Sequence, residues 1–122
     1  MKEKRIQEVL GALNLKYIKQ YKFKDCRNKL PLPFDFCIFL NNKKIILIEF
    51  DGEQHFIFST NWDKTEEKFK KRQLNDKKKT AYCELNNIPL LRIAYWDFDN
   101  IEQLILSFLK NYDNEIIRSV SN

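Results

Sequence analysis

The sequence predicts an α/β fold in which a mixed β-sheet is flanked by helices. Three observations predict it: amphipathic helical patterns near both ends of the chain, two apolar strand patterns joined by a short turn in the middle, and a third apolar strand that follows a long polar helix. The expected order is helix, three strands, helix, strand and closing helix. Apolar strands in such an order need helices on both faces of their sheet.

The first elements are predicted from periodicity. Residues 3–14 form an amphipathic helix, and residues 17–23 alternate apolar and polar side chains as a strand does, before a polar loop at 24–29. The apolar residues of the helix recur at intervals of three and four: Ile6, Val9, Leu10 and Leu13.

A hairpin is predicted next. Residues 34–40 and 44–50 are strand-like, and Asn41-Asn42-Lys43 joins them, with asparagines that tolerate the left-handed backbone of a tight turn. Residues 45–48 are all apolar, so this strand should lie in the middle of the sheet with helices on both sides. Gly52 ends it.

The second half supplies a helix, a strand and a helix. Residues 64–85 form a long, lysine-rich helix, Pro89 opens a strand at 90–95, and residues 101–117 form a closing amphipathic helix. On the long helix, one face is marked by residues three or four apart: Phe69, Arg72, Asp76, Lys79 and Cys83.

Length and composition predict one soluble domain over residues 1–122. The chain is 43% apolar and 32% charged, and its apolar runs are far shorter than the roughly 18 residues that span a bilayer. We therefore expect no membrane association and an intracellular site of action.

Charge and cysteine usage narrow the class of partner. The net charge of +5 favours an anionic partner such as nucleic acid. The cysteines form no C-x-x-C pair, which favours reduced thiols over disulfides or a zinc site.

Acidic residues inside apolar strands carry the chemical signal. Asp35, Glu49 and Asp51 interrupt otherwise hydrophobic segments. Burying an ionised carboxylate is costly unless a cation or hydrogen-bond donors compensate it, so three such groups close together predict a divalent metal. Oxygen ligands favour Mg²⁺ or Mn²⁺.

The hairpin loop decides whether these acids meet. Glu49 and Asp51 are two residues apart and share one face of their strand. Asp35 joins them only if the loop has an odd number of residues or a bulge, because a two-residue loop at Asn42-Lys43 would turn it away. His55 follows four residues after Asp51 and is a candidate general base or acid.

Each of these residues also has a purely structural interpretation. Asp35 could be a solvated residue at a strand edge, and His55 could be structural. Glu49 and Asp51 could form salt bridges with basic residues, for which the candidates are Lys44, Arg72 and Arg92.

Four segments together resemble the PD-(D/E)XK nuclease superfamily, in the branch similar to very-short-patch repair endonucleases and to phage homing endonucleases with an EDxHD motif. The resemblance covers about Glu3 to Leu106 and implies a restriction-endonuclease-like core of helix, three strands, helix and strand. The segments are Phe34-Asp35-Phe36, Ile48-Glu49-Phe50-Asp51-Gly52-Glu53-Gln54-His55-Phe56, Asn75-Asp76-Lys77-Lys78-Lys79-Thr80-Ala81-Tyr82-Cys83 and Ile88-Pro89-Leu90-Leu91-Arg92-Ile93.

The resemblance implies a metal-dependent DNA endonuclease that uses Mg²⁺ or Mn²⁺. It also implies that the protein acts in the cytoplasm or, as a viral or phage protein, in its host cell. Asp35 corresponds to the first metal-binding aspartate, Glu49 and Asp51 to the acids of the next strand, and His55 to the active-site histidine. The outlying acids of the EDxHD pattern match Asp76 and Glu3, with Glu8 as the rival of Glu3.

The motif differs from the family pattern at three positions. Pro33 is displaced by one residue from the family's Pro-Asp pair. Asp51 stands where the family has its motif lysine, so Lys79 or His55 would take over the task of that lysine. Asn75 stands where related sequences commonly have arginine.

Basic side chains predict where DNA would bind. Phosphate contacts are expected from Lys71, Arg72, Lys78 and Lys79 on the long helix and from Arg27. No sequence-reading motif is recognisable, which favours a homodimer, a separate DNA-recognition partner, or recognition of a DNA structure such as a mismatch or a branch. The alternatives are a catalytically inactive nucleic-acid-binding module with the nuclease fold, and an interaction protein whose acids only pair with lysines.

Overall fold

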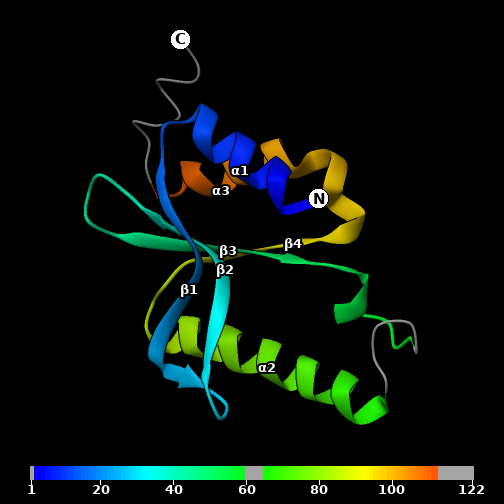
Figure 1. Cartoon of the computed structure of the whole chain (residues 1–122). Coiled ribbons are helices and arrows are strands. Elements are labelled where there is room, and N and C mark those ends of the chain that lie inside the picture. Colours follow the sequence, from blue (N-terminus) through cyan, green and yellow to red (C-terminus); the bar gives the residue numbers. More distant parts are fainter. Residues whose placement is uncertain (1, 60–64, 113–122) are drawn as a thin grey trace.

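The computed structural model describes residues 2–59 and 65–112 and has a four-stranded sheet between two layers of helices (Figure 1). The order of elements predicted from the sequence is confirmed, with two short 3₁₀ segments added. The elements are α1 (Lys2–Ala12), β1 (Lys16–Arg27), β2 (Pro31–Phe39), β3 (Ile45–Asp51), η1 (Glu53–His55), α2 (Glu66–Leu85), β4 (Leu90–Ala94), η2 (Tyr95–Asn100) and α3 (Ile101–Lys110).

The sheet is mixed, with strand order β1-β2-β3-β4. The pairs β1–β2 and β2–β3 are antiparallel, and β3–β4 is parallel. Helices α1 and α3 lie on one face of the sheet and α2 on the other (Figure 1). Strand β3 is internal and its residues 46–49 are all buried, so the central position predicted for it is confirmed.

Two apolar clusters fix the helices to the sheet. The larger lies on the α1 and α3 side and includes Ile6, Leu10, Ile48, Ile93 and Ile105. The smaller lies on the α2 side and is made of Cys26, Phe34, Cys37, Leu47 and Cys83. Within the described ranges, no helix has the length and apolarity to cross a bilayer.

Several predicted boundaries differ from the structure, including the start of β2, which lies at Pro31 instead of residue 34. Strand β1 continues to Arg27 through the loop predicted at 24–29, because Cys26 is buried against the α2 side of the sheet. Helix α3 ends at Lys110 instead of residue 117, and residues 113–117 lie outside the described part of the chain. Lys64, the predicted start of α2, also lies outside it, and Thr65 caps the helix by accepting a hydrogen bond from the Lys68 backbone N–H at 3.2 Å.

The β2–β3 loop has the odd length that the acids require. The backbone N–H of Leu40 donates to the Lys44 carbonyl at 2.9 Å, which leaves residues 41–43 as the loop. Lys43, not an asparagine, has the left-handed backbone, with φ of 67°. Phe36 pairs with Ile48, and continuing this register places Asp35 opposite Glu49.

The β1–β2 hairpin has a register shift between Lys22 and Arg27, and a second distortion lies at Gln20 and Asp35. Lys19 pairs with Phe36 and Tyr21 with Phe34, so the register is the same on both sides of this second distortion. The inward face changes there, because Phe36 belongs to the larger apolar cluster and Phe34 to the smaller one. Gln20 has φ of 54°, and the hairpin beyond it bends towards α2 (Figure 1).

The loop conformation gives a stability prediction. Lys43→Gly should raise the free energy of unfolding by roughly 0.5–1 kcal/mol, because glycine removes the Cβ clash of the left-handed backbone. The matched control, Lys44→Gly, should lower it, since the neighbouring lysine does not have a positive φ. Urea unfolding measures both, and destabilisation by both variants would contradict the loop geometry.

Candidate active site

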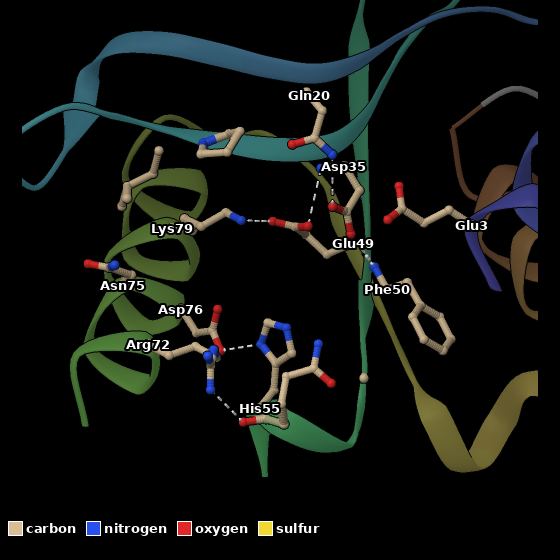
Figure 2. A pocket seen from close by; sticks show the side chains of 14 residues that line it. Glu3, Gln20, Asp35, Glu49, Phe50, His55, Arg72, Asn75, Asp76 and Lys79 are labelled. Carbon is tan, nitrogen blue, oxygen red and sulfur yellow. Dashed lines mark hydrogen bonds and ion pairs between the residues drawn. The ribbon is translucent and has the colours of Figure 1, made fainter. Parts of the chain in front are cut away.

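One pocket of about 610 Å³ collects most of the predicted site residues. Its walls come from the bent hairpin, the end of β3, η1, the start of α1 and one face of α2 (Figure 2). The predicted residues that line it are Glu3, Asp35, Glu49, His55, Arg72, Asp76 and Lys79.

Main-chain hydrogen bonds from the opposite strand fix the carboxylates of Asp35 and Glu49. Beyond the Phe36–Ile48 pair, β2 and β3 make no further ladder pairs. The Asp35 backbone N–H instead donates to Glu49 Oε2 at 3.2 Å, and the Phe50 backbone N–H donates to Asp35 Oδ2 at 2.7 Å. Each carboxylate thus has one oxygen fixed by a main-chain donor on the opposite strand.

Glu49 is the most perturbed acid in the pocket. It is only 3% exposed, and its Oε1 forms an ion pair with Lys79 Nζ from α2 (Figure 2). Burial, together with the neighbouring Asp35 carboxylate, raises the pKa of Glu49 to about 8, although Lys79 acts in the opposite direction. The site therefore favours added positive charge.

Glu3 is the α1 acid that belongs to this pocket. It points towards Asp35 (Figure 2), and burial and the Asp35 charge raise its pKa while Lys19 lowers it. Glu8 instead pairs with Arg5 at 3.5 Å and lines a different pocket. Of the two rivals in the sequence, Glu3 is thus the one beside Asp35.

His55 and Asp76 form a hydrogen-bonded pair. His55 is the last residue of η1, and its Nδ1 lies 2.7 Å from Asp76 Oδ2 on α2. Arg72 donates to the Gln54 carbonyl at 3.1 Å and so ties η1 to α2. With Nδ1–H assigned as the donor to Asp76, Nε2 is left as a proton acceptor on the side of the ring that faces Glu49 (Figure 2).

Asp51 does not join the carboxylates, although it shares their side of the sheet. It is 6% exposed, and Arg92 Nη1 lies 3.0 and 3.2 Å from its two oxygens. It lines a separate depression with Thr80. The salt bridge with Arg92, one of the structural interpretations, is therefore what the chain forms, and the predicted set of three metal-binding acids does not assemble.

The basic residues divide between the pocket and the surface. Lys79 is only 9% exposed and pairs with Glu49, so the phosphate contact predicted for it would lie inside the pocket, which Arg72 also lines. Lys71 is exposed and Lys78 half-buried on α2. Arg27 is exposed at the end of β1, where it donates to backbone carbonyls of the hairpin end.

The structure adds Gln20, which no sequence pattern singled out, and gives definite partners to Asn75 and Arg92. Gln20 donates from Nε2 to Asp35 Oδ1 at 3.4 Å, and nothing in the sequence marks its left-handed backbone. Asn75 lines the pocket and accepts a hydrogen bond from Asn28 at 3.1 Å. For Arg92 there was a signal, since an arginine inside the apolar strand 90–95 needs a buried partner.

Asp35 and Glu49 are suitable ligands for a divalent cation. In the described ranges, no three His, Cys, Asp or Glu side chains converge closely enough to hold an ion alone. Mg²⁺, however, commonly binds one or two protein carboxylates and completes its shell with water and phosphate oxygens. The adjacent carboxylates, and the raised pKa of Glu49, fit such an ion.

Comparison with known proteins adds no relative: no family model matches the chain, and neither a curated protein nor a solved structure matches it.

Glu49 gives a prediction for stability against pH. Its pKa is about 8 in the folded protein against 4.5 for an ordinary glutamate, so folding takes up a proton between these values. The stabilisation is full below about pH 4.5 and is lost as the pH rises through about 8. In EDTA, wild type should therefore lose stability relative to Glu49→Gln as the pH increases from 5 to 8.

Urea unfolding at each pH measures this difference, and Glu53→Gln, at an exposed neighbouring acid, is the matched control. It should follow the wild-type curve. Parallel curves for wild type and Glu49→Gln would show that Glu49 is not perturbed.

Proposed function

We propose that the chain is a metal-dependent DNA endonuclease that hydrolyses phosphodiester bonds, of the PD-(D/E)XK type to which its motifs bear a resemblance. The observation that carries the proposal is one pocket in which the Asp35 and Glu49 carboxylates, locked by main-chain donors, face the hydrogen-bonded pair of His55 and Asp76. Adjacent carboxylates and an oriented imidazole suit metal-assisted hydrolysis.

Asp35 and Glu49 would hold the cation, Mg²⁺ or Mn²⁺. When bound, it supplies positive charge to the phosphate and makes a bound water more acidic. Glu3 extends the negative potential beside Asp35, which attracts the cation to this end of the pocket.

His55 moves the proton. Its Nε2 faces the carboxylates and accepts a proton from the attacking water, or returns one to the leaving oxygen. Asp76 fixes the ring through Nδ1 at 2.7 Å and stabilises the imidazolium that forms. Because His55 sits on a short 3₁₀ segment, Arg72 and its bond to the Gln54 carbonyl help to keep the ring in place.

Lys79 takes the task of the missing motif lysine. Its ammonium reaches Glu49 from α2 and lines the same pocket as His55. A lysine in this position stabilises negative charge that develops on the phosphate. Since the strand position of the motif lysine is occupied by Asp51, the lysine of this site would come from the helix.

Cleavage itself is the first test. Plasmid DNA incubated with the protein should be cut in Mg²⁺ or Mn²⁺ and left intact in EDTA. Asp35→Asn and Glu49→Gln should each lower the rate by at least about 100-fold because the cation loses a ligand. His55→Ala should lower it by about 10²- to 10⁴-fold, as loss of a general base does.

Glu8→Gln is the matched control on α1, because Glu8 points away from the pocket, and it should cleave at the wild-type rate. Calorimetry with Mn²⁺ should show binding by wild type and Glu8→Gln and a loss in Asp35→Asn. DNA binding without cleavage under any divalent cation would instead support an inactive nucleic-acid-binding module.

DNA affinity should fall as salt rises. Lys71→Ala and Lys78→Ala should each weaken binding of a short duplex, and each should reduce the log–log salt slope by about 1 if it removes one phosphate contact. Lys110→Ala, on α3 across the sheet, is the control and should change neither. Fluorescence anisotropy at several salt concentrations measures the slope, and unchanged slopes in all variants would place the DNA elsewhere.

A further inference from the structure

The part of α2 from its start to Asp76 buries no apolar side chain, and its half-buried Phe69 packs on Phe58, which lies outside the sheet. The buried residues of this helix are Lys79 and Cys83, both on the C-terminal side of Asp76. Leu74, the nearest large apolar residue before Asp76, is 49% exposed. The position of Asp76 relative to the sheet therefore depends on polar contacts.

Arg92 makes several of the polar contacts that join this part of α2 to the sheet, in addition to the Lys79–Glu49 ion pair and the Asn28–Asn75 hydrogen bond. Arg92 lies on β4, and its Nη2 donates to the Asp76 main-chain carbonyl at 2.8 Å. Its Nε donates to Thr80 Oγ1 at 3.1 Å, one helical turn further along α2. Its Nη1 binds the Asp51 carboxylate of β3 at 3.0 and 3.2 Å. One guanidinium thus links β3, β4 and two turns of α2.

We propose that Arg92 is a positioning residue that sets the distance and orientation of Asp76 to His55 by clamping α2 against β3 and β4, with Asp51 as its anchor. The proposal rests on the function proposed above, in which His55 transfers the proton. Arg92 itself lines the depression on the far side of His55 and not the pocket of the carboxylates, so it acts through Asp76.

Asp51 explains why the clamp has to be an arginine. Asp51 Oδ1 lies 3.8 Å from His55 Nδ1, close enough to compete with Asp76 for that ring nitrogen. Arg92 engages both Asp51 oxygens and leaves Asp76 as the hydrogen-bond partner of His55. A lysine could neutralise Asp51, but its single ammonium cannot also span the Thr80 hydroxyl and the Asp76 carbonyl in the geometry of a planar fork.

The test compares Arg92→Lys with wild type. Arg92→Lys should lower kcat by about 100-fold with little change in KM, because a displacement of about 1 Å in the catalytic geometry has a cost of that order. The imidazole ¹⁵N resonances of His55, the single histidine of the chain, should also shift in the metal-free protein in EDTA. The control is Arg5→Lys, whose arginine also pairs with two acids, at 3.5 and 3.2 Å, but on the surface of α1 and α3.

The two readouts separate the possible failures. A wild-type kcat in Arg92→Lys, or a lower kcat with unchanged His55 resonances, would overturn the positioning role. If wild type cuts no DNA under any divalent cation, the proposed endonuclease function fails, and the His55 spectrum alone then decides whether Arg92 positions the pair. Arg5→Lys should leave both readouts unchanged, and Arg92→Lys should give a circular dichroism spectrum like that of wild type.

Discussion

The site depends on the place where β2 separates from β3. Beyond the Phe36–Ile48 pair, two main-chain N–H groups lose their partners in the ladder, and a buried N–H without an acceptor is strongly unfavourable. The Asp35 and Glu49 carboxylates accept these two hydrogen bonds. The same bonds that close the gap in the sheet therefore fix the oxygens that would hold a cation, and the structural and functional tasks of these acids cannot be separated.

Each acid of β3 has its own basic partner, and the two pairs differ in character. Asp51 is bound by a guanidinium that is itself fixed by two further acceptors on α2, the Thr80 hydroxyl and the Asp76 carbonyl, so this pair is a closed structural unit. Glu49 meets the flexible side chain of Lys79 at the wall of an open pocket. Only in the second pair can a metal ion replace the basic side chain, Lys79, without breaking the contact between α2 and the sheet.

Much of this arrangement could be predicted from the sequence. Strand alternation placed Glu49 and Asp51 on one side, and the parity argument stated the condition for Asp35 to face Glu49, which the loop at 41–43 meets. The partner of Asp51 could not be predicted in this way. Alternation along a strand predicts which face a side chain is on, but not which groups lie beside it at that point of the strand. Asp51 lies two residues, or about 7 Å, further along β3 than Glu49, out of reach of Asp35 and within reach of Arg92.

The distortion at Gln20 was also beyond prediction, because a positive φ at a non-glycine residue leaves no mark in the sequence and is imposed by the surrounding fold. The face of α2 that points inward, in contrast, could be predicted. The residues Arg72, Asp76, Lys79 and Cys83 were expected on one face of α2, and this is the face that meets the pocket and the core.

That helical face also explains how one site can combine a perturbed acid with access to an ion. Cys83 lies in the apolar cluster, where burial raises the pKa of its thiol to about 11, whereas Asp76 lines the pocket, about 10 Å away along the helix axis. Lys79 lies between the two, so the Glu49 carboxylate it meets stands at the border of core and pocket. If the Glu49 carboxylate lay deeper in the core, a cation could not reach it. If it lay further out, water would screen its repulsion from the Asp35 carboxylate, and this repulsion is what makes a bound cation favourable.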